Sequence, residues 1–195
     1  MKRAIATVLL AVLVCAALVA AQQPPKPTPA PELKKLDYFA GNWKSEGEVK
    51  PGPFGPGGKF TTTEHNEWMP GRFFLALHSN GTFAGMGHIT ESGFMGYNTE
   101  DKVYTYDAFN SMGEAEHSKG TVEGDTWTWT STEKMGGQTM KGRFTMTIAS
   151  PTSYSYKFEI AAEASANYTT VVEGKATKVT APKAAKGAEG AATKK

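Results

Sequence analysis

From Trp43 to Ala176 the chain alternates apolar and polar positions with a period of two, which is typical of half-buried strands. The clearest run is Thr126 to Thr130, in which two tryptophans share one face and threonines occupy the other. Glycine, proline, asparagine and aspartate interrupt the alternation about every 8–12 residues. The pattern therefore predicts about ten strands joined by short turns, and short turns join only antiparallel neighbours.

The strand that begins at Trp43 is followed by strands expected at 60–69, 72–79, 83–97, 102–109, 114–122, 126–130, 138–148, 153–161 and 167–176. The segment 83–97 carries four glycines and is interpreted as one or two bent strands, and Asn80-Gly81 is a hairpin signal. We expect an up-and-down, lipocalin-like β-barrel, because closure removes both sheet edges. A two-sheet sandwich is the alternative, which would need a long crossover that the sequence lacks.

One segment has a helical period instead. Leu33, Leu36 and Phe39 recur at a three-residue step, with charged residues between them. Pro31 suits the first turn, and Gly41 supplies a residue that can end a helix. We expect one short helix that plugs the barrel next to its first strand.

The N-terminus has the form of a signal peptide. A basic start precedes an almost continuous apolar run over 4–19, and small residues lie before Gln22. We expect residues 1–21 to be cleaved on export to the periplasm or the extracellular space, which leaves no membrane span; an uncleaved anchor is the alternative. Residues 22–31 then form a proline-rich linker, 32–177 the barrel domain, and 178–195 a disordered tail rich in alanine and lysine.

Cysteine and charge narrow the function. Cys15, the only cysteine, lies in the signal segment, so thiol catalysis is excluded for the mature chain. The whole chain has a formal net charge of +2, but the lysines concentrate in the tail and leave residues 32–174 acidic. An acidic domain argues against nucleic acid as a partner.

Seven segments together resemble an uncharacterised bacterial family, domain of unknown function 1579: LDYFAGNWKSEGE, PGPFGPGGKF, EWMPGRFFL, MGYNTEDKVYTY, SMGEAEHSKGTV, DTWTWTSTEKMGG and MKGRFTM. The resemblance covers about 33–178. It implies membership of the calycin superfamily of β-barrels, and with it a lumen and a small ligand, but no established activity. Calycins often pair the first-strand tryptophan with a basic residue on the last strand, which implies Lys175 as the partner of Trp43.

No hydrolase, phosphate-loop, dinucleotide or zinc-protease motif occurs in the sequence, and no cofactor is expected. His65 and Glu67 share a strand face, and His78 on the next strand could add a third metal ligand. Separate surface histidines are the favoured interpretation.

Aromatic residues are the stronger candidates for a binding site. The candidates are Trp43, Phe54, Tyr104, Tyr106, Trp127, Trp129 and Phe144. Facing inward they would line a lumen, with Phe54 over its mouth; facing outward they would form cross-strand pairs, and alternation alone does not choose between the two faces. The apolar face that carries Phe144 and Met146 is expected inside.

We expect a binder or carrier of a small apolar or amphipathic molecule. A non-catalytic envelope or structural protein with a filled lumen is the alternative. An enzyme that acts in the barrel mouth ranks third.

Overall fold

The computed structural model describes residues 26–52, 55–135 and 137–179. The predicted signal peptide, Phe54 and nearly all of the predicted tail lie outside these ranges. Of the predicted linker, residues 26–31 are described: 26–30 have no regular structure, and Pro31 is already the first residue of the helix.

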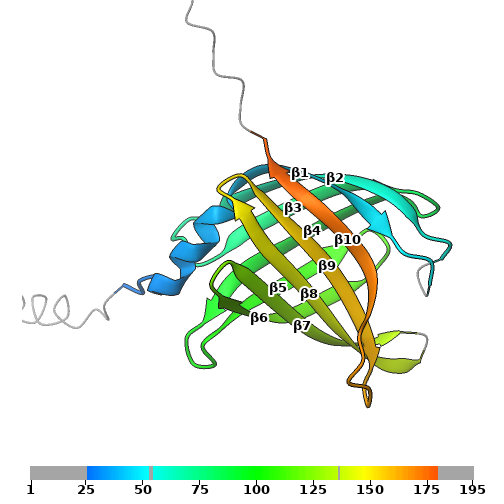
Figure 1. Ribbon diagram of the computed structural model, residues 1–195. Coiled ribbons are helices and arrows are strands. Elements are labelled where there is room, and N and C mark those ends of the chain that lie inside the picture. Colours follow the sequence, from blue (N-terminus) through cyan, green and yellow to red (C-terminus); the bar gives the residue numbers. More distant parts are fainter. Residues whose placement is uncertain (1–25, 53–54, 136, 180–195) are drawn as a thin grey trace, which may run out of the picture.

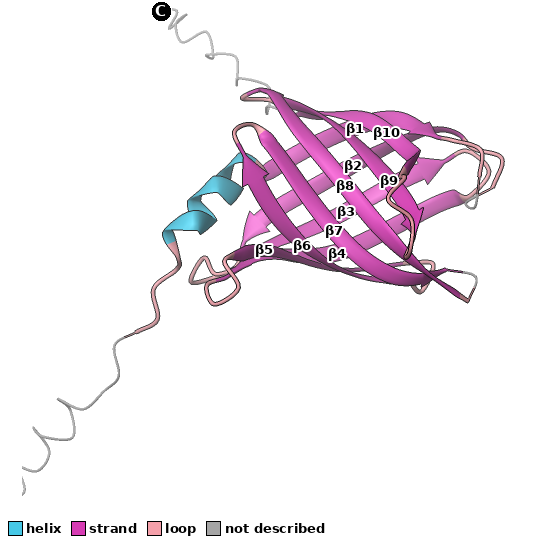
Figure 2. Ribbon diagram, turned by 60° about the horizontal axis from the view of Figure 1, so that its bottom comes forward, coloured by secondary structure: helices cyan, strands magenta, loops and turns pink. Residues whose placement is uncertain are grey.

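Ten antiparallel strands close into a single barrel (Figures 1 and 2). They are β1 (Gly41–Val49), β2 (Gly58–Trp68), β3 (Leu75–Phe83), β4 (Gly87–Asn98), β5 (Val103–Asn110), β6 (Ala115–Glu123), β7 (Thr126–Met135), β8 (Gln138–Ser150), β9 (Ser153–Ala162) and β10 (Thr169–Lys178). Each strand pairs with its neighbours in sequence, and β1 pairs with β10 to close the sheet. The predicted up-and-down barrel is confirmed, and the sandwich alternative is wrong.

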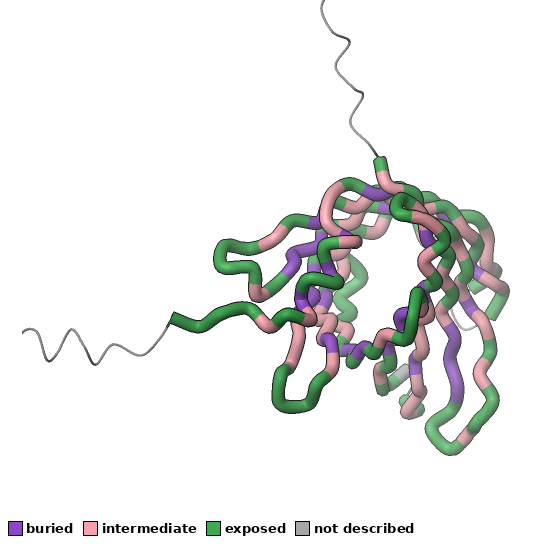
Figure 3. Tube along the Cα trace, turned by 60° about the vertical axis from the view of Figure 1, so that its left-hand side comes forward, coloured by how far each residue is buried: buried purple, intermediate pink, exposed green. Residues whose placement is uncertain are grey.

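Alternation along each strand separates the inside of the barrel from the outside, as the buried and exposed positions in Figure 3 show. In β1, Trp43 and Val49 are buried, whereas Lys44 and Glu46 between them are exposed. The face of β8 that carries Phe144 and Met146 points inward, as predicted, because both residues line an internal cavity.

The predicted helix lies against one end of the barrel (Figure 2). It is a 3₁₀ helix, η1 (Pro31–Tyr38), and it buries Leu33 and Leu36. It ends before Gly41, because the N–H of Phe39 already donates to the carbonyl of Leu36 at 3.0 Å. Gly41, with φ 107°, opens β1 instead of capping the helix. A non-glycine residue would be strained at that angle.

Hydrogen bonds from three strands hold this plug in place. Trp43 Nε1 and Asn66 Nδ2 both donate to the carbonyl of Phe39, at 2.8 and 3.0 Å. Lys178 Nζ donates to the carbonyl of Tyr38 at 3.0 Å. These bonds satisfy carbonyls that the helix end leaves without intrahelical partners, so the plug is part of the barrel core.

The basic partner of Trp43 is Lys178 and not Lys175. Lys178 lies directly opposite Trp43 in the β1–β10 register, and its Nζ lies 5.2 Å from the centre of the indole ring. Lys175 is exposed and lies opposite Glu46, on the outer face of the barrel. The resemblance predicted the right strand, but a register three residues too early reverses the side of the sheet.

The hairpin predicted at Asn80-Gly81 is also wrong, because β3 runs through both residues to Phe83. Gly81 is buried and faces inward. A Cβ at Gly81 would lie 2.7 Å from Thr62 Cγ2 and 2.8 Å from the ring of Phe83. Glycine is therefore required here for close packing between strands, and the turn follows at 84–86.

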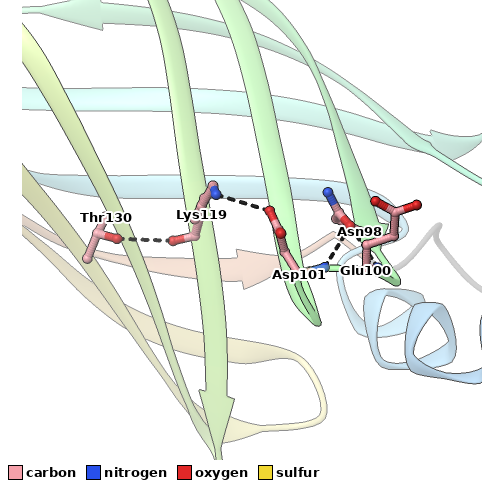
Figure 4. Close-up of polar contacts among 5 residues, drawn as sticks. All are labelled: Asn98, Glu100, Asp101, Lys119 and Thr130. Carbon is pink, nitrogen blue, oxygen red and sulfur yellow. Dashed lines mark hydrogen bonds and ion pairs between the residues drawn. The ribbon is translucent and has the colours of Figure 1, made fainter.

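One group of polar contacts lies on the outside of the barrel, next to the β4–β5 turn (Figure 4). Asn98 Oδ1 accepts from the N–H groups of Glu100 and Asp101, which fixes the β4–β5 turn. Lys119 Nζ donates to Asp101 at 3.1 Å, and its carbonyl accepts from Thr130. Exposed pairs of this kind add at most about 1 kcal/mol each to stability. Among the described residues, no helix is long and apolar enough to span a membrane.

Candidate functional site

Beyond the plug, the barrel encloses a cavity of about 350 Å³. Its walls are mostly aromatic, aliphatic and methionine side chains, together with three glutamates: Phe39, Glu64, Leu77, Phe83, Glu91, Met95, Tyr106, Glu116, Trp129, Phe144, Met146, Tyr154, Phe158 and Val172. The cavity runs from Phe39 beneath the helix to Phe83 at the end of β3. It lies within the size range typical of small-molecule sites.

The predicted aromatic residues separate into two layers. Trp43, Tyr104 and Trp127 are buried at the plug, and none of them lines the cavity. Tyr104 also donates from its hydroxyl to the carbonyl of Glu32 at 2.9 Å, which ties β5 to the helix. These three residues therefore have a structural position. The seventh candidate, Phe54, lies outside the described residues.

The other three predicted aromatics, Tyr106, Trp129 and Phe144, line the cavity. Trp129 stacks on Trp127 with ring centres 6.1 Å apart and planes 14° from parallel. It lies against Gly120, where a Cβ would come within 2.6 Å of the indole. The glycine on β6 thus creates the flat space that the indole occupies, and Trp129 joins the plug layer to the lumen layer.

Three carboxyl groups, from alternate strands, point into the same space: Glu64 on β2, Glu91 on β4 and Glu116 on β6. Glu64 and Glu91 both lie opposite Ser79 of the intervening strand β3. Glu116 lies opposite Ala108 of β5, which in turn lies opposite Gly93 of β4. Small residues between the glutamates leave their carboxyl groups facing the cavity.

Each carboxylate accepts a hydrogen bond from a neutral side chain. Tyr106 donates from its hydroxyl to Glu91 at 2.5 Å, and Ser118 donates to Glu116 at 2.5 Å. Asn66 Nδ2 donates to Glu64 as well as to the carbonyl of Phe39. The cavity lining contains no Lys, Arg or His, so no cation among these described residues compensates the three carboxyls.

Burial raises the pKa of all three carboxyl groups, because an ionised carboxylate loses solvation in an apolar cavity. The pKa of Glu116 rises to about 7, despite the lowering effect of its hydrogen bond from Ser118. Repulsion from Glu91 adds to the raised pKa of both Glu64 and Glu116. Burial also raises the pKa of Tyr106 well above its ordinary value. Burial therefore favours the neutral, protonated form of each carboxyl group more than water does.

The three glutamates were not among the site residues predicted from the sequence, although the alternation along their strands carried a signal for them. Glu64 shares its strand face with Phe60 and Trp68. Glu91 shares its face with Met95 and Tyr97 on β4. An acid on a strand face that also carries large apolar side chains is unusual for a soluble core, where charges are rarely buried without a partner.

The histidines form no common site. His65 and His78 lie opposite each other on the outer faces of β2 and β3, and both are exposed. His65 Nδ1 lies 2.8 Å from Asn42 Oδ1, and its Nε2 is 3.9 Å from Glu67. Within the described part of the chain, no three His, Cys, Asp or Glu side chains are placed to bind a metal ion.

A larger hollow, of about 990 Å³, lies against the other side of the barrel wall at β1, β2, β8, β9 and β10. Its lining alternates charges of both signs, such as Glu46 and Glu173 with Lys59 and Lys157. Because these side chains are exposed, they are well solvated and gain little from binding. The smaller internal cavity has the composition of a ligand site.

The sequence profile of a family described as "Protein of unknown function (DUF1579)" matches residues 28–178. No curated protein matches the chain. The crystal structure of Rv2717c from M. tuberculosis is similar over 78% of this chain and 99% of its own, with a TM-score of 0.53 and 13% identity, which shows the barrel fold. A structure of EF1p2_mFAP2b bound to DFHBI is a weaker likeness, with a TM-score of 0.42, 13% identity, and 75% and 98% coverage.

Proposed function

This chain belongs to DUF1579, a family of proteins of unknown function, and we propose that it binds a small apolar or amphipathic molecule in the lumen of its barrel. The observation that supports binding is the internal cavity of about 350 Å³ with its aromatic and methionine wall. Apolar cavities with a few convergent polar groups are the usual form of small-molecule sites.

The unequal filling of the barrel supports this proposal. Near the helix, Leu36, Trp43 and Leu75 have at most 1% of their surface exposed. The same small barrel leaves a cavity of about 350 Å³ in its middle, where Glu64, Glu91 and Glu116 stand in place of apolar side chains. Close-packed interiors contain few voids larger than a water molecule, so an unfilled centre favours an occupant.

A structural barrel is the second candidate, favoured by the well-fastened plug. In that case the lumen holds only water, which would hydrogen-bond the three carboxyls. The two functions differ in one observable property, because only a binder keeps an organic molecule through purification. Mass spectrometry of the extracted protein separates them.

We propose that the protein acts outside the cytoplasm, after cleavage before Gln22. The support is the basic start and apolar run in residues 1–21 of the sequence. N-terminal sequencing of protein from the exporting cell tests this location. A mature chain that begins near Gln22 in the extracytoplasmic fraction is expected, and intact Met1 on cytoplasmic protein would contradict export.

Lumen binding is tested by the fluorescence of Trp129, which lines the cavity. A panel of neutral, cationic and anionic aromatic and aliphatic compounds is titrated into the protein. We expect a saturable change with micromolar affinity, which corresponds to about 8 kcal/mol. Phe144→Ala should alter this affinity, whereas the matched change Phe109→Ala, at a side chain with 59% of its surface exposed, should not. A panel that leaves the emission unchanged contradicts the proposal.

A further inference from the structure

We infer that the lumen takes an organic cation: a small, flat apolar body that carries a protonated or quaternary amine. The inference deepens the proposed function and rests on it, since it names the class of ligand for the same cavity. Its basis is the charge of the cavity wall, where Glu64, Glu91 and Glu116 meet without a basic side chain among the lining residues.

The acids all lie on one side of the cavity. Glu64, Glu91 and Glu116 line it from β2, β4 and β6, among apolar residues such as Met95, whereas the lining residues on β7 to β10 include no acid. A ligand with one charged end and one flat apolar end matches this division. Aromatic faces also attract cations, so rings next to the charged end would add to the preference.

A buried polar atom provides a second observation that points to a ligand. Trp129 has 3% of its surface exposed and lines the cavity, and its indole N–H has no acceptor among the described residues. An unpartnered buried polar group is costly, so a ligand that also carries an oxygen acceptor would supply the partner that this N–H lacks.

The acidic lining favours a cationic ligand over a carboxylate such as a fatty acid. A carboxylate ligand would enter a space in which any ionised glutamate repels it, and no Lys, Arg or His lines the cavity to offset the repulsion. A cation is attracted by each ionised glutamate and displaces the protons that burial holds on them. Cation binding should therefore release protons, whereas carboxylate binding should take protons up.

The test uses three naphthalene probes of similar shape. Naphthylmethyl trimethylammonium carries a fixed positive charge, neopentylnaphthalene is its neutral carbon isostere, and naphthaleneacetate is an anion. Binding is measured by tryptophan fluorescence and by calorimetry in buffers of different ionisation enthalpy, which count the protons released. At pH 8 we expect the cation to bind about tenfold or more tightly than the neutral isostere, which is about 1.4 kcal/mol.

The pH dependence has a defined sign. As the pH falls from 8 to 5.5, Glu116, whose pKa is about 7, takes up a proton, so the affinity of the quaternary cation should fall about tenfold while that of the neutral isostere stays level. Several titratable groups act on these carboxyls: Glu91 on Glu64 and Glu116, Glu114 and Tyr106 on Glu91, and Glu133 and His117 on Glu116. The fixed charge of the probe ensures that only the protein titrates.

A matched pair of variants on β2 assigns the effect to the lumen. Glu64→Gln keeps the shape of an inward side chain and removes its charge. It should lower the affinity for the cation about tenfold and leave the affinity for the neutral isostere unchanged. Glu67→Gln, three residues along on the exposed outer face, should leave both affinities unchanged. Unchanged binding of the neutral isostere would also show that the Glu64→Gln barrel is folded.

The outcomes separate the two levels of the proposal. If the neutral isostere binds as tightly as the cation, or naphthaleneacetate binds most tightly, the cation inference is overturned and lumen binding stands. If the cation binds more tightly but Glu67→Gln weakens it as much as Glu64→Gln, the charge that matters is outside, and the inference fails. If none of the three probes binds, the result counts against the proposed function itself.

Discussion

The two halves of this barrel use aromatic side chains for opposite purposes. At the helix end, Trp43, Tyr104 and Trp127 are buried in one cluster, and none of them lines the cavity. In the middle, Trp129 and Phe144 form one side of a cavity whose other side carries glutamates. Residue type therefore does not decide the role, because aromatic side chains fill one end of the barrel and line a lumen in the other. The difference lies in what each strand places opposite them.

Of the substitutions that test this comparison, removing the plug residue Trp43 should have the largest effect on stability. Trp43 has 1% of its surface exposed and its indole donates to the helix, so Trp43→Ala removes packing and a buried hydrogen bond together. We expect a loss of about 3–5 kcal/mol in the free energy of unfolding, measured in denaturant melts.

The matched truncation in the lumen is Phe144→Ala, which should cost less, about 1–3 kcal/mol, because one side of this ring already faces a cavity. Equal losses at Trp43 and Phe144 would show that the two halves are packed alike.

Neutralising one carboxyl should stabilise the barrel. The pKa of Glu116 is about 7 in the folded chain, against an ordinary value of 4.5. The folded state therefore holds this proton more tightly than the unfolded chain does. The stability that comes from this difference is fully present below about pH 4.5 and is lost as the pH rises to 7. Above pH 7 the ionised group costs up to roughly 3 kcal/mol.

Glu116→Gln should therefore raise the free energy of unfolding by up to about 3 kcal/mol at pH 8 and have little effect at pH 4. Glu123→Gln, at an exposed position of the same strand β6, provides the control and should change stability by less than about 0.5 kcal/mol. A Glu116→Gln barrel that is less stable at pH 8 would show that the carboxylate is well solvated.

Adding one methyl group at Gly120 should disturb the junction between the two halves. The new Cβ would lie 2.6 Å from the indole of Trp129, which stacks on Trp127 and cannot simply retreat. We expect Gly120→Ala to cost about 1–3 kcal/mol and to shift the tryptophan emission. An unchanged spectrum together with full stability would mean that the indole has room to move in the lumen.

The smallest expected effect concerns the lysine that fastens the helix. Lys178→Met removes the hydrogen bond to the carbonyl of Tyr38 and the charge over Trp43, and should cost about 1–2 kcal/mol. Lys175→Met, on the exposed face of the same strand, should be close to neutral in the same thermal or denaturant melts. A larger effect at Lys175 than at Lys178 would contradict the observed register.

Much of the fold could be predicted because each strand carries its own period-two pattern, as in Thr126 to Thr130. The errors arose where one residue serves two purposes. Asn80-Gly81 has the composition of a turn, yet Gly81 is required by the contact with Thr62 inside the sheet. Local sequence does not reveal which atoms will lie across the strand.

The candidate site was predictable only in part, for a related reason. Alternation shows that Trp127 and Trp129 share a face, but only the closed barrel shows that the first belongs to the plug and the second to the lumen. The glutamates at 64, 91 and 116 lie on three separate strands, so their convergence depends on registers that no single segment contains.

The seam of the barrel joins the two ends of the described chain. β1 and β10 are neighbours, with Trp43 opposite Lys178, so the sheet cannot close until its last strand has been synthesised. Pairs so distant in sequence form late, because the whole intervening chain must be ordered before they gain anything. A nascent chain that lacks β10 has two open edges and no lysine for its plug. Cleavage within this last strand should therefore release seam and plug together and leave an unclosed sheet open to proteases.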